Sequence, residues 1–452
     1  MLSPAQILDR ISKRLDLLKG GRDADARQQT LRATIEWSYD LLNRAEQTLF
    51  ARLSVFAGGC TLESAEAVCD ADLDVLQSLV DKSLVGHADE RFTMLETIRE
   101  YAAERLAESS TAEAIRRRHA EHLLALAEES ETHLLGRGAE EWHDRLEREY
   151  DNLRAALDYF ESNGDIQVAM RLTGAMSEFW DQRAHHSEGM RRFARLLAAD
   201  DRPTDARAKA LDGASTMAGK SSEMLTAIGW SEEALAIHRA LGDERGMGIS
   251  LWGLGYLRVE QGEPESAEEL LTESIRLLRG AGDEASLLWA TRTLAFTYLT
   301  LGDLARARPL YEATLRGARA AGDDALQGAT LGALSKIAVD EGRLVDAVSI
   351  SRESLRTLGE VGDRLLAVSV ICSAASVLTS IGRSATAARL MSYADVEYEE
   401  SRAREPWVDT MNSDTLSVIR AQLDEAAFAD AWEQGRKLTT DKAVALALGE
   451  MP

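Results

Sequence analysis

From residue 242 onward, apolar residues recur with helical periodicity, and a glycine interrupts the pattern every 20 residues. These glycines are Gly242, Gly262, Gly282, Gly302, Gly322, Gly342, Gly362 and Gly382. Most of them are followed by an acidic residue, as in "LGD" at 241–243 and "AGD" at 281–283. A glycine in the left-handed conformation ends one helix, and an aspartate after it caps the next. The pattern therefore predicts one helix and its turn in every 20 residues.

Small side chains repeat with twice that period, which makes 40 residues the structural unit. They are Gly255, Ala295, Ser335 and Ala375 in the first helix of each unit, and Ala267, Ala307, Ala347 and Ala387 in the second. Small residues at fixed positions let paired helices approach closely, so we predict helical hairpins stacked as an α-solenoid. Five such units over residues 203–402 resemble the long tetratricopeptide hairpins of bacterial signalling ATPases. HEAT repeats have a similar length but lack this small-residue code.

Residues 28–110 follow a different pattern, with three predicted helices and then "SLVGHADERFTML", which alternates like a β-hairpin. The phrases "TLRATIEWSYDLL", "LFARLSVFAGG", "LVDKSLV" and "MLETIREYAAERL" are similar to the winged-helix segment of STAND-class ATPases, in LuxR- or SARP-type bacterial transcriptional regulators. The resemblance implies an all-α chain in which a small winged-helix domain precedes a right-handed α-solenoid. It further implies a remnant of the ATPase lid helix at 1–27, an irregular helical-hairpin linker at 111–202 and capping helices at 403–452.

Members of that family carry their Walker motifs upstream of the lid, and we find none in that position here. We therefore expect a non-catalytic sensor or interaction module of a STAND-type regulator, without a cofactor and without its nucleotide-binding core. One stretch offers an alternative: "ASTMAGKS" at 214–221 fits a loose phosphate-binding loop with Lys220 and Ser221 as candidate ligands. A phosphate-binding loop needs a strand before it and a helix after it. Because a helix-forming run precedes Ala214, we expect a helix there.

The charge of the chain argues against broad contact with nucleic acid. It has 76 acidic and 52 basic side chains, a formal net charge of −24, and such a surface repels phosphate backbones. The candidate recognition helix at 72–82 carries Asp72, Asp74 and Asp81 against Lys82. We expect no direct DNA binding, although regulation through the winged helix remains an alternative. No window of 18 uncharged apolar residues occurs, so we expect a cytoplasmic protein without membrane contact.

Metal-binding and catalytic sets are not recognisable by spacing. Cys60, Cys69 and Cys372 form no C-x-x-C pair, and His119 and His122 share a helical face without further ligands, which is typical of exposed histidines. We therefore expect no metal site and no catalytic residues.

The candidate binding residues lie in the first helix of each hairpin, which normally lines the concave side of such an array. Counted from the small residue of each unit, the groove positions give Trp252, Tyr256, Trp289, Arg292, Phe296 and Lys336. Aromatic rings flanked by cations suit a protein or peptide partner, or a small-molecule inducer. The alternative is that Trp252 and Trp289 fill space between helices.

Overall fold

The computed structural model describes residues 31–183, 185–220, 223–357, 364–401 and 406–451, and the expected lid remnant, Ser221 and Gly362 lie outside these ranges. The chain divides into two compact units. One unit is formed by the residues up to 128 together with 145–165, and the other by 129–144 together with 166–452. Each unit is described separately below.

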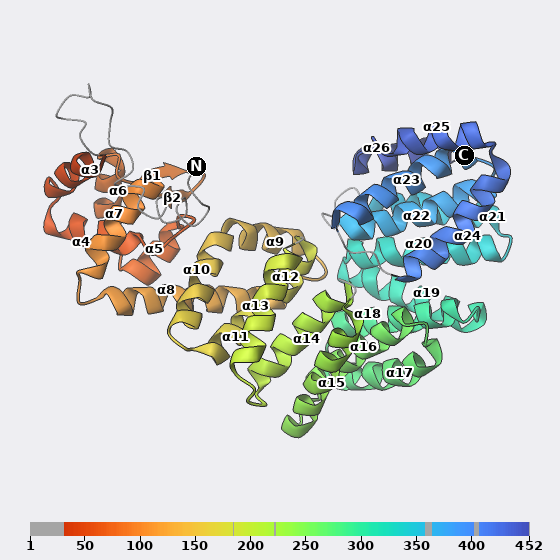
Figure 1. Cartoon of the computed structure of the whole chain (residues 1–452), viewed down its shortest axis with the longest axis horizontal. Coiled ribbons are helices and arrows are strands. Elements are labelled where there is room, and N and C mark those ends of the chain that lie inside the picture. The colour runs from red at the N-terminus through yellow and green to blue at the C-terminus, as the bar shows by residue number, and fades with distance from the viewer. Residues whose placement is uncertain (1–30, 184, 221–222, 358–363, 402–405, 452) are drawn as a thin grey trace, which may run out of the picture. The chain divides into compact units, whose positions relative to one another are not determined.

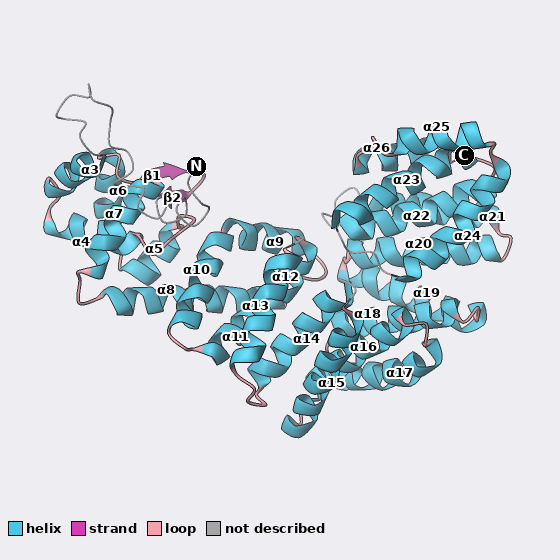
Figure 2. Ribbon diagram, in the orientation of Figure 1, coloured by secondary structure: helices cyan, strands magenta, loops and turns pink. Residues whose placement is uncertain are grey.

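From residue 31 onward, the described part of the first unit opens with helices α3 to α6 and a β-hairpin (Figure 1). The helices are α3 (Leu31–Asp40), α4 (Arg44–Leu53), α5 (Leu62–Cys69) and α6 (Leu73–Asp81). Strands β1 (Gly86–Ala88) and β2 (Arg91–Thr93) then pair antiparallel, and α7 (Glu96–Ala107) follows (Figure 2). Asp89 and Glu90 form the two-residue turn, with φ of 49° and 62°, as a type I′ hairpin requires. The predicted hairpin is therefore present.

The expectation of three helices before the hairpin was wrong, because Asn43 starts a separate helix. Its side chain accepts a hydrogen bond from the Glu46 amide at 3.0 Å, and the Glu46 carboxylate accepts one from the Asn43 amide at 2.8 Å. This capping box begins α4 after only three residues, 41–43, that follow the end of α3. Buried Glu46 also accepts a hydrogen bond from Ser78 Oγ at 2.6 Å and pairs with Lys82, which ties α4 to α6.

Helices α8 (Ala112–Glu131), α9 (Ala139–Arg148) and α10 (Tyr150–Ser162) follow. Asn152 at the start of α10 donates to the Gly59 carbonyl at 2.9 Å and accepts from the Gly58 amide at 3.3 Å. These bonds fix α10 in the first unit. His119 on α8 is 3% exposed and packs edge-on against Phe56, so the expectation that it is exposed was wrong.

The second unit contains α11 (Ile166–Ala175), α12 (Ser177–Gln182), α13 (His186–Ala199) and then the array. The first helices of successive hairpins are α14 (Asp205–Lys220), α16 (Glu244–Glu260), α18 (Glu284–Thr300), α20 (Asp324–Asp340) and α22 (Arg364–Ser380). The second helices are α15 (Met224–Leu241), α17 (Pro264–Ala281), α19 (Leu304–Ala321), α21 (Leu344–Thr357) and α23 (Ser384–Ser401). The last helices that the structure describes are α24 (Pro406–Gln422), α25 (Glu425–Gly435) and α26 (Thr440–Glu450), and α25 and α26 both contact α23.

The turns of the array confirm the glycine pattern. Each described glycine of the 20-residue series has a positive φ, between 66° and 78°. At four of the turns an aspartate side chain caps the next helix, as Asp283 does by accepting from the Ser286 amide at 3.0 Å. The small residues are buried, and two of the second-helix serines, Ser274 and Ser354, donate to first-helix carbonyls 26 residues earlier at 2.7 Å.

Candidate partner-binding surface

The six residues assigned to the groove lie on three successive first helices of the array. Trp252 and Tyr256 are on α16, Trp289, Arg292 and Phe296 are on α18, and Lys336 is on α20. Helix α18 contacts both α16 and α20. Phe296 is 9% exposed, and the other five are half-buried. The structure therefore places them on adjacent helices, with side chains that divide between packing and the surface.

Trp252 connects two hairpins. Its indole Nε1 donates to Thr293 Oγ1 on α18 at 2.9 Å, and its ring packs against the core around Leu271, Ala295 and Tyr311. An acceptor 41 residues further along the chain thus satisfies the only polar atom of this side chain. Much of Trp252 therefore fills space between hairpins.

Trp289 and Arg292 lie together, and their polar atoms lack the partners that Trp252 has. The Arg292 Cζ lies 5.6 Å from the centroid of the Trp289 ring. Among the described residues, Trp289 Nε1 and Arg292 Nε are buried atoms without a hydrogen-bond partner, and no carboxylate forms an ion pair with the guanidinium. The pair is therefore a cation on an aromatic face with unused donor capacity.

The remaining assigned residues are engaged elsewhere. Lys336 donates to Asp340 one turn along its own helix at 3.1 Å. Phe296 belongs to the core between α18 and α19, and Tyr256 packs against the core formed by α15, α16 and α17. The structure therefore joins Trp289 to Arg292 but gives Lys336 and Tyr256 separate surroundings.

Tyr311 on α19 is a neighbour that the sequence reasoning missed. It is 0% exposed, and its hydroxyl has no hydrogen-bond partner in the part of the chain that the structure describes. Burial raises the pKa of this phenol, and the positive charge of Arg292 acts in the opposite direction. The sequence does mark Tyr311 as unusual, because the residues at the same position one unit before and one unit after are Leu271 and Ser351. A phenol at that position is a departure from the repeat.

A second polar cluster joins α14, α15 and α16. His238 is 3% exposed, with Nε2 3.1 Å from Asp212 Oδ2 and Nδ1 2.8 Å from Asp243 Oδ2, and Asp212 also accepts from Ser250 Oγ at 2.7 Å. Burial lowers the pKa of His238, but the hydrogen bond to Asp212 and the nearby carboxylates outweigh it and raise the pKa above its usual value. One oxygen each of Asp205 and Asp243 and one nitrogen of His238 lie within 4.8 Å of one another. The contacts of His238 with Asp212 and Asp243 account for this grouping.

The Walker-like stretch is helical through Lys220, where α14 ends. Ala214 is fully buried, and Ser215 Oγ donates to the Ala227 carbonyl at 2.8 Å. The backbone N–H groups of this stretch lie inside a helix, so they do not form the loop that wraps a phosphate. The candidate Ser221 lies outside the described residues.

The acidic helix α6 has its few complementary side chains already engaged. Gln77, its only amide, donates to Asp81 at 2.9 Å, and Lys82 pairs with Glu46. Direct reading of bases needs arginine, lysine or amide groups that are free to face a groove. The surroundings of α6 therefore favour packing within the protein over DNA contact.

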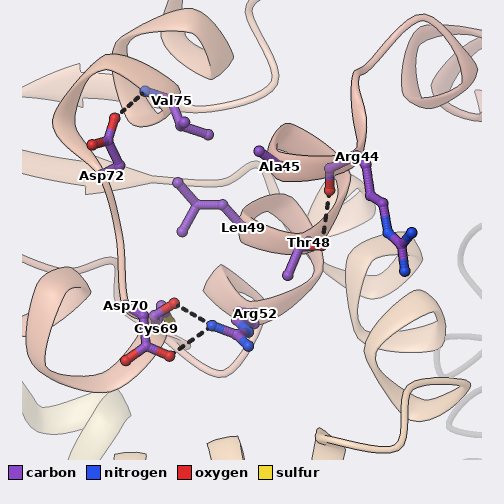
Figure 3. A pocket seen from close by; sticks show the side chains of 9 residues that line it. All are labelled: Arg44, Ala45, Thr48, Leu49, Arg52, Cys69, Asp70, Asp72 and Val75. Atoms are coloured by element: carbon purple, nitrogen blue, oxygen red, sulfur yellow. Dashed lines mark hydrogen bonds and ion pairs between the residues drawn. The ribbon is translucent and has the colours of Figure 1, made fainter.

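A pocket of about 440 Å³ lies in the same unit, between α4 and the segment that joins α5 to α6 (Figure 3). Arg52 crosses its edge and donates to the Cys69 carbonyl at 3.0 Å and to Asp70 at 2.7 Å. Asp72 on the opposite side caps α6 through the Val75 amide at 3.1 Å. The polar groups shown bonded in this pocket serve structural roles, and we assign it no chemistry.

Residues 42–107 match the family model of the winged helix-turn-helix domain. The geometry agrees, since this range holds α4 to α7 and the β-hairpin as its wing. Residues 42–107 are a winged helix-turn-helix domain.

Of the helices that the structure describes, none has both the length and the apolar composition of a membrane span.

Two curated relatives extend the similarity. A Mycobacterium bovis protein, provisionally named as an HTH-type transcriptional regulator, is 38% identical over 283 residues, which are 56% of this chain and 31% of that protein. An uncharacterised Mycobacterium tuberculosis protein is 39% identical over 135 residues, 27% of this chain and 34% of its own length. The chain thus spans about a third of the length of these relatives. It is homologous to proteins named as regulators.

One solved structure has the same fold over nearly the whole chain. It is the signal transduction ATPase with numerous domains, with a tetratricopeptide repeat sensor, from Pyrococcus horikoshii. The TM-score is 0.52 at 14% identity, and the match covers 99% of this chain and 72% of that protein. The combination of a winged helix-turn-helix domain with a tetratricopeptide-like helical array is therefore confirmed.

Proposed function

We propose that this chain is the non-catalytic sensor and interaction module of a STAND-type transcriptional regulator. The array takes up a protein or peptide partner on the side formed by its first helices, and the winged helix-turn-helix domain belongs to the regulator that responds. Homology to proteins named as regulators supports the first part. The fold shared with a STAND protein, whose repeats are called its sensor, supports the second.

The observation that carries the proposal is the Trp289–Arg292 pair on α18. Arg306 and Lys336 of the array pair with carboxylates, whereas Arg292 lies on an aromatic ring without an ion pair among the described residues. Exposed aromatic and arginine side chains are the residues most often found to dominate binding energy at interfaces. A surface of this kind is expected where a partner docks.

The test uses the tagged chain as bait in lysate of its own host, followed by binding measurements with the purified partner. The groove variant combines Arg292→Gln with Lys336→Gln. The control combines Arg276→Gln with Arg319→Gln, which removes the same charge from exposed positions on α17 and α19. We expect the control to bind like the wild type and the groove variant to bind at least about tenfold more weakly. Equal affinity of both variants would contradict binding at this surface.

A further inference from the structure

The chemistry of the partner is indicated by the hydrogen-bond acceptors that the array offers to side chains at the same position of successive hairpins. Trp252 and Arg292 occupy the same position in successive hairpins, 40 residues apart. Trp252 donates to Thr293, which lies 41 residues further on, in the next hairpin. The residue 41 positions beyond Arg292 is Ala333, and the residue 40 positions beyond it is Gly332. Neither has a side-chain acceptor, so the array satisfies the first donor and leaves the second without an equivalent partner.

Two further polar groups lie near Arg292, the indole of Trp289 and the hydroxyl of Tyr311. Trp289 Nε1 and Tyr311 Oη can each donate, and neither has a hydrogen-bond partner among the described residues. Tyr311 is fully buried, so its hydroxyl is not open to a ligand on the surface. On the next first helix, Asp340 accepts from Lys336. Arg292 is half-buried, so a ligand that pairs with its guanidinium must bring acceptors and negative charge.

We infer that Arg292, supported by the Trp289 ring, binds a carboxylate group of a peptide partner between α18 and α20. The guanidinium offers parallel N–H donors in a planar fork that matches the two oxygens of a carboxylate. The Trp289 ring lies beside the guanidinium, with Cζ 5.6 Å from the ring centroid, and limits the rotamer freedom that binding would otherwise remove. The inference rests on the proposed function, because it assigns the ligand chemistry of the same surface. The carboxylate comes from a peptide C-terminus or from an aspartate or glutamate side chain.

The experiment measures fluorescence anisotropy with three pools of fluorescein-labelled random heptapeptides. The first pool lacks Asp and Glu and is amidated, the second lacks them but has a free C-terminus, and the third is amidated with one central Asp or Glu. The full chain is compared with Arg292→Gln and with Arg276→Gln, whose exposed guanidinium already pairs with Glu273 at 2.7 Å. Thermal unfolding checks that the Arg292 variant folds, as expected for a residue without an ion pair.

We expect one carboxylate pool to bind about tenfold or more tightly than the neutral pool, since a hydrogen bond to a charged group contributes about that factor. Preference for the second pool identifies a C-terminus, and preference for the third an acidic side chain. The preference should disappear in Arg292→Gln, persist in Arg276→Gln and be partly retained in Arg292→Lys, which keeps the charge without the fork.

Results that contradict the carboxylate site can be distinguished from results that contradict peptide binding. Equal binding of all three pools contradicts the carboxylate site and leaves peptide binding intact. A carboxylate preference that persists in Arg292→Gln places the site elsewhere and contradicts the assignment. No binding of any pool at millimolar peptide contradicts the carboxylate site and peptide binding together.

Discussion

Replacing Tyr311 by phenylalanine should stabilise the free protein, although it removes a polar atom from a buried side chain. The ring keeps its packing, because only the hydroxyl oxygen is lost, and that oxygen has no hydrogen-bond partner among the described residues. A buried hydroxyl without a partner costs about 1–3 kcal/mol of desolvation. Attraction between the phenol dipole and Arg292 offsets part of this cost, so we expect a gain of about 1 kcal/mol.

Tyr298→Phe is the matched control, since Tyr298 lies on the paired helix α18 and is 8% exposed. Its hydroxyl donates to Glu268 Oε1 at 2.9 Å. Removal of this bond should destabilise the array by about 1 kcal/mol, because the acceptor is charged but partly exposed. The two substitutions delete the same atom and are therefore expected to act with opposite sign.

The assay is hydrogen exchange of the α18 and α19 amides, followed by mass spectrometry, because repeat arrays open locally and a single unfolding midpoint averages over them. A change of 1 kcal/mol corresponds to about fivefold in exchange rate. Exchange should become slower in Tyr311→Phe and faster in Tyr298→Phe. Faster exchange in both variants would mean that the Tyr311 hydroxyl is satisfied in the free protein, and the reasoning would fail.

Three further predictions concern single residues. Gly59→Ala should destabilise the first unit by about 3 kcal/mol, because φ is +75° and the new Cβ would lie 2.6 Å from the Phe92 carbonyl oxygen; amide exchange at β2 reports it. Glu46 has its pKa lowered to about 2 by its bonds to lysine and serine side chains, so its stabilisation, present above pH 4.5, should be lost as the pH falls towards 2. Urea unfolding from pH 6 to 3 should show a loss of about 2 kcal/mol that is absent in Glu46→Gln. His238 has a raised pKa, so its stabilisation is complete below pH 6.5 and should be lost as the pH rises through the folded-state value; a stability curve from pH 6 to 9 that does not differ between wild type and Asp212→Asn would contradict this.

The sequence determined the features that depend on local backbone conformation and on the repeat. A glycine such as Gly282 adopts the left-handed conformation because it lacks a Cβ, and the aspartate after it caps the next helix. Both features depend only on neighbouring residues of the chain, so the sequence alone predicts them. The buried small residues follow from the 40-residue period, since every hairpin meets its neighbour in the same way. The start of α4, which the sequence analysis missed, was also predictable, because Asn43 and Glu46 have the spacing of a capping box.

Tertiary structure alone decided which polar atoms found a partner. Trp252 and Trp289 both lie on first helices of the array, yet the indole of Trp252 donates to Thr293 and that of Trp289 has no acceptor among the described residues. The burial of His119 against Phe56 and the placing of Asp212 beside His238 likewise depend on contacts between separate helices. Periodicity identifies the face of a helix on which a residue lies, but it does not specify the acceptors on the helix opposite. The candidate site therefore emerged only when the donors of α18 could be compared with what the neighbouring helices offer.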